Sequence, residues 1–224
     1  MKILMLILSS PTINPVYVQH KRIWESYMNS DPRIQCYFIE YHETLDKIIH
    51  GNIFYTKGVE SYHPGCRDKT IEALDYFMNR DPYEYIIRTN LSSLWNFRAL
   101  LNYLPTLPKE KVYAGIIGKY KHAENFYISG SGFIMSPDVA QLLLAHRAQC
   151  NETNIVDDVD IGNVLTKLGV PLLLGRRTDF YSMNMYDKYK YDDTVYHYRV
   201  NSETQRYVEP VIMTKLLESI NKSV

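Results

Sequence analysis

Short runs of apolar residues alternate along the chain with stretches in which apolar residues recur every three or four positions. The runs predict buried strands over residues 2–8, 34–41, 83–89, 111–118, 126–136 and 170–175. The helical spacing predicts helices over residues 18–28, 67–80, 93–104, 139–146 and 159–169. Strands and helices that alternate in this way indicate an α/β fold, in which helices flank a mostly parallel central sheet.

Residues that favour turns and caps mark several of these helix ends. Ser136 is suited to the N-cap of a helix and Pro137 to its first position. Gly169 is suited to the position that follows a helix C-terminus. Pro105 should end the helix over residues 93–104, because the residue before a proline disfavours the helical conformation.

Length and composition narrow the class of protein. The 224 residues contain no internal repeat and no linker-like segment, which predicts a single domain over residues 1–224. Lys plus Arg and Asp plus Glu are balanced at 25 each, which argues against a nucleic-acid partner held by bulk charge. The three cysteines lie far apart and form neither a zinc motif nor a disulfide framework.

The first residues, "MKILMLILSS", could belong to a signal peptide or to a strand. The run lacks a cleavage site and is short, so it predicts a first buried strand. No apolar run approaches the roughly 20 residues of a membrane span. We therefore expect a cytoplasmic protein with no transmembrane segment, and the oligomeric state stays open.

A polar group of side chains follows the apolar strand in "YIIRTNLSSLWNF". Arg88, Thr89, Asn90, Ser92 and Ser93 stand where the strand should meet solvent, and no carboxylate accompanies them. Ligands of α/β sheets bind at the carboxyl ends of the strands. These side chains are candidate ligand contacts, or they could simply cap the following helix.

Two further stretches could carry chemistry. Gly130, Ser131 and Gly132 remove bulk from a strand, which allows a ligand or another backbone to approach closely or marks a bulge. Asp157, Asp158 and Asp160 stand at the start of a predicted helix, where a carboxylate can cap the helix. Three of them together favour a functional role instead, with one as a general base and its neighbour binding a substrate hydroxyl.

The late segment "VYHYRVNSETQRY" contributes His197, Arg199 and Arg206. Guanidinium groups pair with phosphate oxygens, so this segment could bind a diphosphate or could be an ordinary solvated surface. The chain has no phosphate-binding loop, dinucleotide fingerprint, nucleophile elbow or H-E-x-x-H motif.

In order, "KRIWESY", "RTNLSS", "SGSGFIMSPD" and "DDVDIG" resemble motifs of nucleotide-sugar glycosyltransferases with the GT-A fold, especially the fringe and β-1,3-galactosyltransferase type. The chain also resembles small glycosyltransferases of large DNA viruses and bacterial polysaccharide clusters, and the likeness extends from about Lys2 to Arg206. This resemblance implies a Rossmann-like GT-A sandwich.

The resemblance also assigns roles to residues. Asp158 falls on the family's base, and Asp157 stands beside it with Gly130, Ser131 and Gly132 on the acceptor or sugar side. The residues expected to bind the donor are Lys69, Arg88, Thr89, Asn90, Ser92, His197, Arg199 and Arg206, with Glu60 lining the same side. His197 would also be the residue that contacts a metal ion.

The chain departs from the family at the D-x-D position. Aspartates there hold Mn²⁺ or Mg²⁺ in the family, whereas Thr89, Asn90 and Ser92 are poorer ligands for these cations. Hydroxyl and amide groups can instead hydrogen-bond a nucleotide sugar.

The sequence therefore predicts an inverting hexosyl- or pentosyltransferase that uses a nucleoside-diphosphate sugar, expected to be a UDP-sugar, and a glycan acceptor. An inactive GT-A module that binds nucleotide or glycan is one alternative, favoured by the loss of D-x-D. A nucleotidyltransferase is another, although "SSPTINPVYVQHKR" is not a convincing Gly-rich basic loop.

Overall fold

The computed structural model describes residues 1–119, 126–151, 155–189 and 191–223. The chain divides into two compact units, each assembled from three separate segments. The first unit contains residues 1–11, 32–90 and 108–175, and the second contains residues 12–31, 91–107 and 176–224. The prediction of one domain is not tested by this division, since each unit draws on distant parts of the sequence.

An eight-stranded sheet forms the centre of the first unit, in the order β3-β4-β2-β1-β5-β8-β7-β9. Neighbours from β4 to β5 run parallel, whereas β8 is antiparallel to both β5 and β7. The strands are β1 (Ile3–Leu8), β2 (Ile34–His42), β3 (Ile48–His50), β4 (Ile53–Lys57), β5 (Tyr85–Asn90), β7 (Tyr113–Lys119), β8 (Phe126–Met135) and β9 (Leu173–Leu174).

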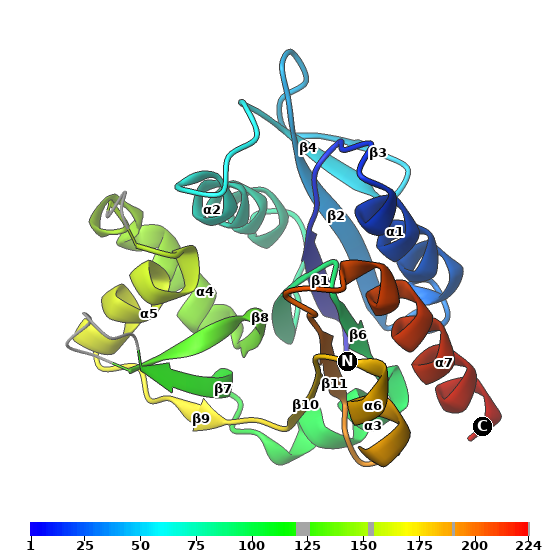
Figure 1. Cartoon of the computed structure of the whole chain (residues 1–224). Helices are drawn as coiled ribbons and strands as arrows, with labels where there is room; N and C mark the ends of the chain where they lie inside the picture. The colour runs from blue at the N-terminus through cyan, green and yellow to red at the C-terminus, as the bar shows by residue number, and fades with distance from the viewer. Residues whose placement is uncertain (120–125, 152–154, 190, 224) are drawn as a thin grey trace. The chain divides into compact units, whose positions relative to one another are not determined.

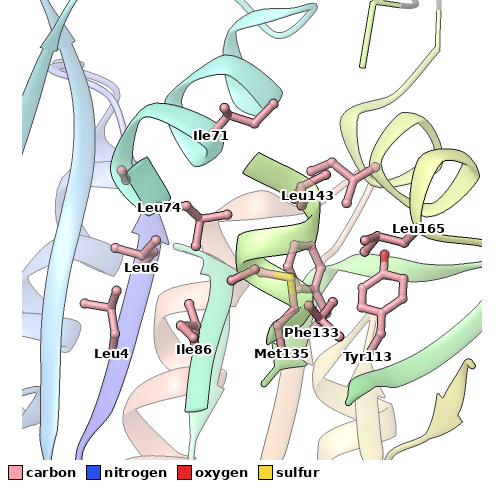
Figure 2. Close-up of a cluster of buried hydrophobic side chains, with 14 of the residues drawn as sticks. Leu4, Leu6, Ile71, Leu74, Ile86, Tyr113, Phe133, Met135, Leu143 and Leu165 are labelled. Carbon is pink, nitrogen blue, oxygen red and sulfur yellow. The ribbon is translucent and has the colours of Figure 1, made fainter. Parts of the chain in front are cut away.

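Three helices of the first unit, α2 (Gly65–Met78), α4 (Pro137–Ala145) and α5 (Asp157–Lys167), pack against one another and against this sheet (Figure 1). Each turns an apolar stripe inward, as Ile71, Leu74 and Phe77 do on α2. Figure 2 shows these stripes meeting side chains from the sheet. The labelled residues of this buried cluster are Leu4, Leu6, Ile71, Leu74, Ile86, Tyr113, Phe133, Met135, Leu143 and Leu165.

The second unit contains a three-stranded sheet in the order β10-β11-β6. Its strands are β6 (Ser93–Trp95), β10 (Arg177–Phe180) and β11 (His197–Val200), and its helices are α1 (Pro15–Tyr27), α3 (Phe97–Tyr103), α6 (Met183–Tyr189) and α7 (Glu209–Lys222). Short 3₁₀ turns occupy Leu104–Thr106 and Arg206–Val208 here, and Arg147–Gln149 in the first unit. Leu94, Phe180, Tyr198 and Val200 give one face of the small sheet a buried apolar surface.

The α/β fold class is confirmed, and most predicted elements are present. The strand over residues 2–8 is β1, a central strand that is buried from Ile3 to Ile7. Ser136 is the N-cap of α4, and Gly169 follows α5 with a φ of 78°. Within the described ranges, no helix is long and apolar enough to cross a bilayer.

The predicted helix over residues 93–104 was wrong in its first part. Ser93–Trp95 form β6 because they pair with β11, and the helix starts only at Phe97. Asn96 is its N-cap and accepts a hydrogen bond from the Ala99 amide at 3.2 Å. Asparagine is a preferred N-cap residue, so Asn96 is a start signal that competes with helical spacing.

Candidate active site

The antiparallel direction of β8 determines where its glycine-containing stretch lies. Thr89 pairs with Gly132 and Arg88 pairs with Phe133. The second half of β8 therefore pairs with β5, and the part of β8 before Gly132 extends past the carboxyl end of β5, the edge at which ligands of α/β sheets bind. Two stretches that the sequence analysis selected separately, "RTN" and "SGSG", are neighbours in one sheet.

The first turn of α5 meets this edge of the sheet. Asp158 Oδ2 accepts a hydrogen bond from the Gly130 amide at 2.5 Å, and its Oδ1 accepts one from the Val159 amide at 3.0 Å. Carboxylates suit the positive end of the helix dipole. The N-cap of α5 is Val156, so Asp158 lies inside the first turn, where it accepts from one amide of its own helix and from one amide of the neighbouring strand.

Arg88 connects Asp157 to Gly130. Its side chain is 1% exposed, and its guanidinium donates to Asp157 Oδ2 and to the Gly130 carbonyl oxygen. A charge at this depth is costly unless it is paired, and Asp157, also buried, supplies the opposite charge. Arg88 is therefore engaged with protein groups in the interior of the first unit.

Gly130 fits closely between these side chains. A Cβ atom at position 130 would lie 2.5 Å from a terminal nitrogen of Arg88 and 2.9 Å from Asp158 Cβ. Such contacts are too short for carbon atoms, so only glycine fits here without a rearrangement. The sequence predicts that a ligand or a backbone approaches this glycine, and in the structure the side chains of Arg88 and Asp158 lie there.

A second arginine anchors α5. Arg67 of α2 donates to Asp160 Oδ2 at 2.8 Å, and both residues are buried. The sequence analysis did not select Arg67, because an arginine in an apolar helical stripe has no local signal of a partner 93 residues away. Two arginines from different elements thus bind carboxylates in the first turn of α5: Arg88 of β5 binds Asp157, and Arg67 of α2 binds Asp160.

The environment of Asp158 favours its protonated form more than water does. Burial raises the pKa of the Asp158 carboxyl above its usual value, and the neighbouring charge of Asp157 raises it further. The hydrogen bonds from the Gly130 and Val159 amides and the charge of Arg88 lower it in part. A carboxylate with a raised pKa is a stronger base, which suits proton removal near neutral pH.

The strand-end hydroxyls differ in their surroundings. Thr89 is buried, and its Oγ1 donates to the Ser131 carbonyl oxygen at 2.7 Å. Asn90 and Ser92 are partly exposed. Ser131 Oγ lies 3.2 Å from Ser129 Oγ, within hydrogen-bond distance. The predicted contacts of these residues with a donor stay predictions.

Lys69 and Glu60, both expected on the donor side, contact each other. Lys69 Nζ donates to Glu60 Oε2 and to the Ser9 carbonyl oxygen, at 2.7 Å in each case. Glu60 Oε1 accepts from the Tyr41 amide at 2.9 Å. This network joins α2 to Ser9, which follows β1, and through Glu60 to the last residues of β2, so Lys69 reaches the carboxyl edge of the sheet.

In the second unit, one face of the small sheet carries His197 and Arg199. His197 is 2% exposed, its ring stacks on Trp95 at 4.3 Å, and its Nε2 shares a hydrogen bond with Ser93 Oγ at 3.1 Å. Burial lowers the pKa of His197 well below its usual value, and the charges of Arg177 and Arg199 lower it further. The imidazole is therefore neutral.

Arg177 has a carboxylate partner, whereas the Nε of Arg199 has no acceptor among the described residues. Arg177 Nε and a terminal nitrogen donate to the two carboxylate oxygens of Asp179, at 2.5 and 2.9 Å. Arg199 Nε is buried and meets no acceptor in the part of the chain that the structure describes. Arg177 and Trp95 were not predicted from the sequence as site residues, although the pairing of β6 and β10 with β11 puts them, with Ser93, on the face of His197.

Arg206 has partners within the second unit. It donates to Glu209 Oε1 at 3.1 Å, to Glu209 Oε2 at 3.2 Å and to the Tyr17 hydroxyl at 2.8 Å. Glu209 is fully buried and also accepts from the Ser202 amide at 2.9 Å. Arg206 therefore neutralises a buried carboxylate, and its predicted contact with a diphosphate would have to be made beside that partner.

The residues at the D-x-D position do not fit a divalent cation of the kind that the GT-A fold implies. Thr89, Asn90 and Ser92 offer hydroxyl and amide oxygens in place of carboxylates. Among the described residues, no three His, Cys, Asp or Glu side chains gather into a metal site. His197 has two arginines nearby, which repel a cation and attract an anion.

Two solved structures share the fold of this chain at low sequence identity. The chain is similar to the solved structure of an active-site mutant of LgtC, with a TM-score of 0.56 and 11% identity over 98% of this chain and 96% of that chain. It is also similar to a glycosyltransferase involved in the glycosylation of the major capsid of PBCV-1, with a TM-score of 0.50 and 12% identity over 96% and 99% of the two chains. No family model and no curated protein sequence matches the chain.

Proposed function

We propose that the chain is a glycosyltransferase that moves a sugar from a nucleoside-diphosphate sugar to a hydroxyl group of a glycan. The expected donor is a UDP-sugar, and the transfer inverts the anomeric configuration as in the fringe type that the motifs resemble. The GT-A fold of the chain supports this class of reaction. The observation that carries the proposal is the carboxylate of Asp158 at the carboxyl edge of the sheet.

Asp158 has the properties of a general base in such a reaction. The acceptor hydroxyl gives its proton to the Asp158 carboxylate while its oxygen forms a bond to the anomeric carbon of the donor. The bond from that carbon to the diphosphate oxygen breaks, and the electron pair leaves on the diphosphate. The raised pKa of Asp158 makes it a stronger base, and the Gly130 amide fixes one of its oxygens.

The second candidate is a GT-A module that binds a nucleotide or a glycan without transfer. The absence of carboxylates at Thr89, Asn90 and Ser92 favours it, because the cation-binding aspartates of the resembled family are missing there. The acidic start of α5 argues for the enzyme, since binding alone needs no buried carboxylate with a raised pKa.

The experiment that separates the two uses the purified chain with a panel of UDP-, GDP- and dTDP-sugars and a panel of glycans. Mass spectrometry measures sugar transfer, and NMR of the product gives its anomeric configuration. The proposal predicts transfer from one donor with inversion. Binding of a nucleotide sugar without transfer or donor hydrolysis would support the module, and retention would remove Asp158 as the base of a single inverting step.

A further inference from the structure

We propose that Arg88 is a positioning residue for Asp158 and not a ligand of the donor. This inference rests on the proposed function, since it gives Asp158 the role of base. It concerns the part of the site that lies within the first unit: Arg88 on β5, Gly130 on β8, and Asp157 and Asp158 on α5.

The geometry couples Arg88 to Asp158 through two residues, Gly130 and Asp157. Arg88 donates to the carbonyl oxygen of Gly130, and the amide of the same Gly130 donates to Asp158 Oδ2 at 2.5 Å. Arg88 also binds Asp157, the residue before Asp158. The position of the Asp158 carboxylate relative to the sheet is thus fixed by contacts that begin at one guanidinium.

Burial leaves Arg88 little freedom to act in another way. Its side chain is 1% exposed, and a Cβ at Gly130 would touch its terminal nitrogen, so the side chain fills a closed space. An arginine that binds a donor diphosphate needs at least one edge of its guanidinium open to the ligand. The terminal nitrogens of Arg88 instead bind protein groups, and its Nε, which meets no acceptor among the described residues, is buried where a ligand cannot reach it.

Arg88 also tunes the charge of Asp158. Its positive charge lowers the pKa that burial and Asp157 raise. Other groups with an electrostatic effect in this region come from the elements packed around α5: Tyr113 of β7, Tyr62 before α2, and Cys66 and Arg67 of α2. The positive charge of Arg88 acts on Asp158 directly.

The test measures the pKa of Asp158 from its carboxyl ¹³C chemical shift, assigned by its loss in Asp158→Asn, alongside the kinetics of transfer. Arg88→Met should raise this pKa, because it removes a positive charge that lowers it. It should lower kcat about 10- to 100-fold, because the base is no longer held in place. The affinity for UDP, measured by calorimetry, should stay within about twofold of wild type.

Two variants control for folding. Arg88→Lys keeps a positive charge for Asp157 but cannot donate in two divergent directions, so kcat should fall while the pKa of Asp158 stays near its wild-type value. Arg67→Met removes the other buried ion pair of α5 and should lower the melting temperature without moving the pKa of Asp158. These variants separate positioning from a general loss of stability.

Three outcomes would overturn the inference. The pKa of Asp158 could be unchanged in Arg88→Met, Arg67→Met could move it equally, or Arg88→Lys and Arg88→Met could lose UDP affinity while kcat is kept. Failure of the proposed function is distinguishable, because the ¹³C measurement needs no turnover. A wild-type chain without transfer, together with the predicted pKa shift, would refute the glycosyltransferase and still support the coupling of Arg88 to Asp158.

Discussion

At Asp158, burial and hydrogen bonding act in opposite directions on one carboxyl group. The net effect is a raised pKa, so Asp158 loses its proton at a higher pH than an exposed aspartate does. Arg199 shows a different balance, because its Nε is buried without an acceptor among the described residues. An unsatisfied donor of this kind is costly, and a bound anion would satisfy it.

Arg199→Ala is therefore expected to weaken the binding of UDP, because a charge-assisted hydrogen bond to phosphate is lost. The expected loss is about 1.5–3 kcal/mol if the contact is desolvated. Calorimetry measures it. Arg206→Ala is the matched variant: its guanidinium is engaged with Glu209 and Tyr17, so we expect a lower melting temperature and a smaller effect on UDP affinity. Equal affinity in wild type and Arg199→Ala would show that Arg199 does not contact the nucleotide.

Removal of divalent cations tests whether transfer depends on a metal ion at the D-x-D position. Because Thr89, Asn90 and Ser92 provide no carboxylate, we expect transfer to persist in part in EDTA. Asn90→Asp combined with Ser92→Asp should raise the affinity for Mn²⁺, measured by calorimetry, if these side chains face the diphosphate. Complete loss of transfer in EDTA, with recovery at micromolar Mn²⁺, would mean that carboxylates elsewhere bind the metal.

Among the elements, β8 and α5 depend most on each other. Gly130 lies where Arg88 and Asp158 meet, and no larger residue fits without displacing one of them. Gly130→Ala should reduce transfer strongly and lower the stability of the chain by about 1–3 kcal/mol, because the added methyl overpacks a buried site. Ser129→Ala on the same strand removes a hydroxyl and adds no bulk, so it should retain far more activity. Wild-type kinetics in Gly130→Ala would show that the close packing there is not required.

The sequence predicted most of this arrangement at the level of elements, and less of it at the level of contacts. Apolar runs and cap residues located β1, β5, β8, α4 and α5, because period and capping are local properties. The direction of β8 and the ion pair of Arg67 with Asp160 were not predicted, since both depend on residues far apart in the chain. The predicted start of α3 was wrong because Ser93–Trp95 pair with β11 as a strand, although their apolar spacing is that of a helix.

At the scale of the whole molecule, buried histidines link stability to pH. His20 is fully buried in the second unit, and burial together with the charge of Arg206 lowers its pKa from 6.5 to about 4. Glu209 lies 3.4 Å from His20 Nε2, but its charge is already compensated by Arg206. The unfolded chain therefore takes up a proton at His20 at a higher pH than the folded chain does.

The consequence is a loss of stability on acidification. As pH falls from about 6.5 to about 4, the free energy of unfolding should decrease through His20 by up to about 3 kcal/mol. Above this window the stabilisation is complete, and below it His20 adds no further change. Denaturant unfolding of wild type and His20→Gln at a series of pH values measures this, and the difference between the two curves should change only inside the window. Parallel curves would show that His20 titrates normally in the folded chain.

The most direct measurement is the transfer rate of Asp158→Asn relative to wild type, with Asp138→Asn as control. Asp138 is also an acidic residue in the first turn of a helix of the first unit, but its Oδ2 accepts from the Lys111 amide at 2.9 Å, away from Gly130. Asp158→Asn should lower the rate by about 10²–10⁴-fold, because the general base is lost, while folding and UDP affinity are kept. Asp138→Asn should transfer at a rate close to wild type. A rate for Asp158→Asn within a few-fold of wild type would contradict the role of Asp158 as the base.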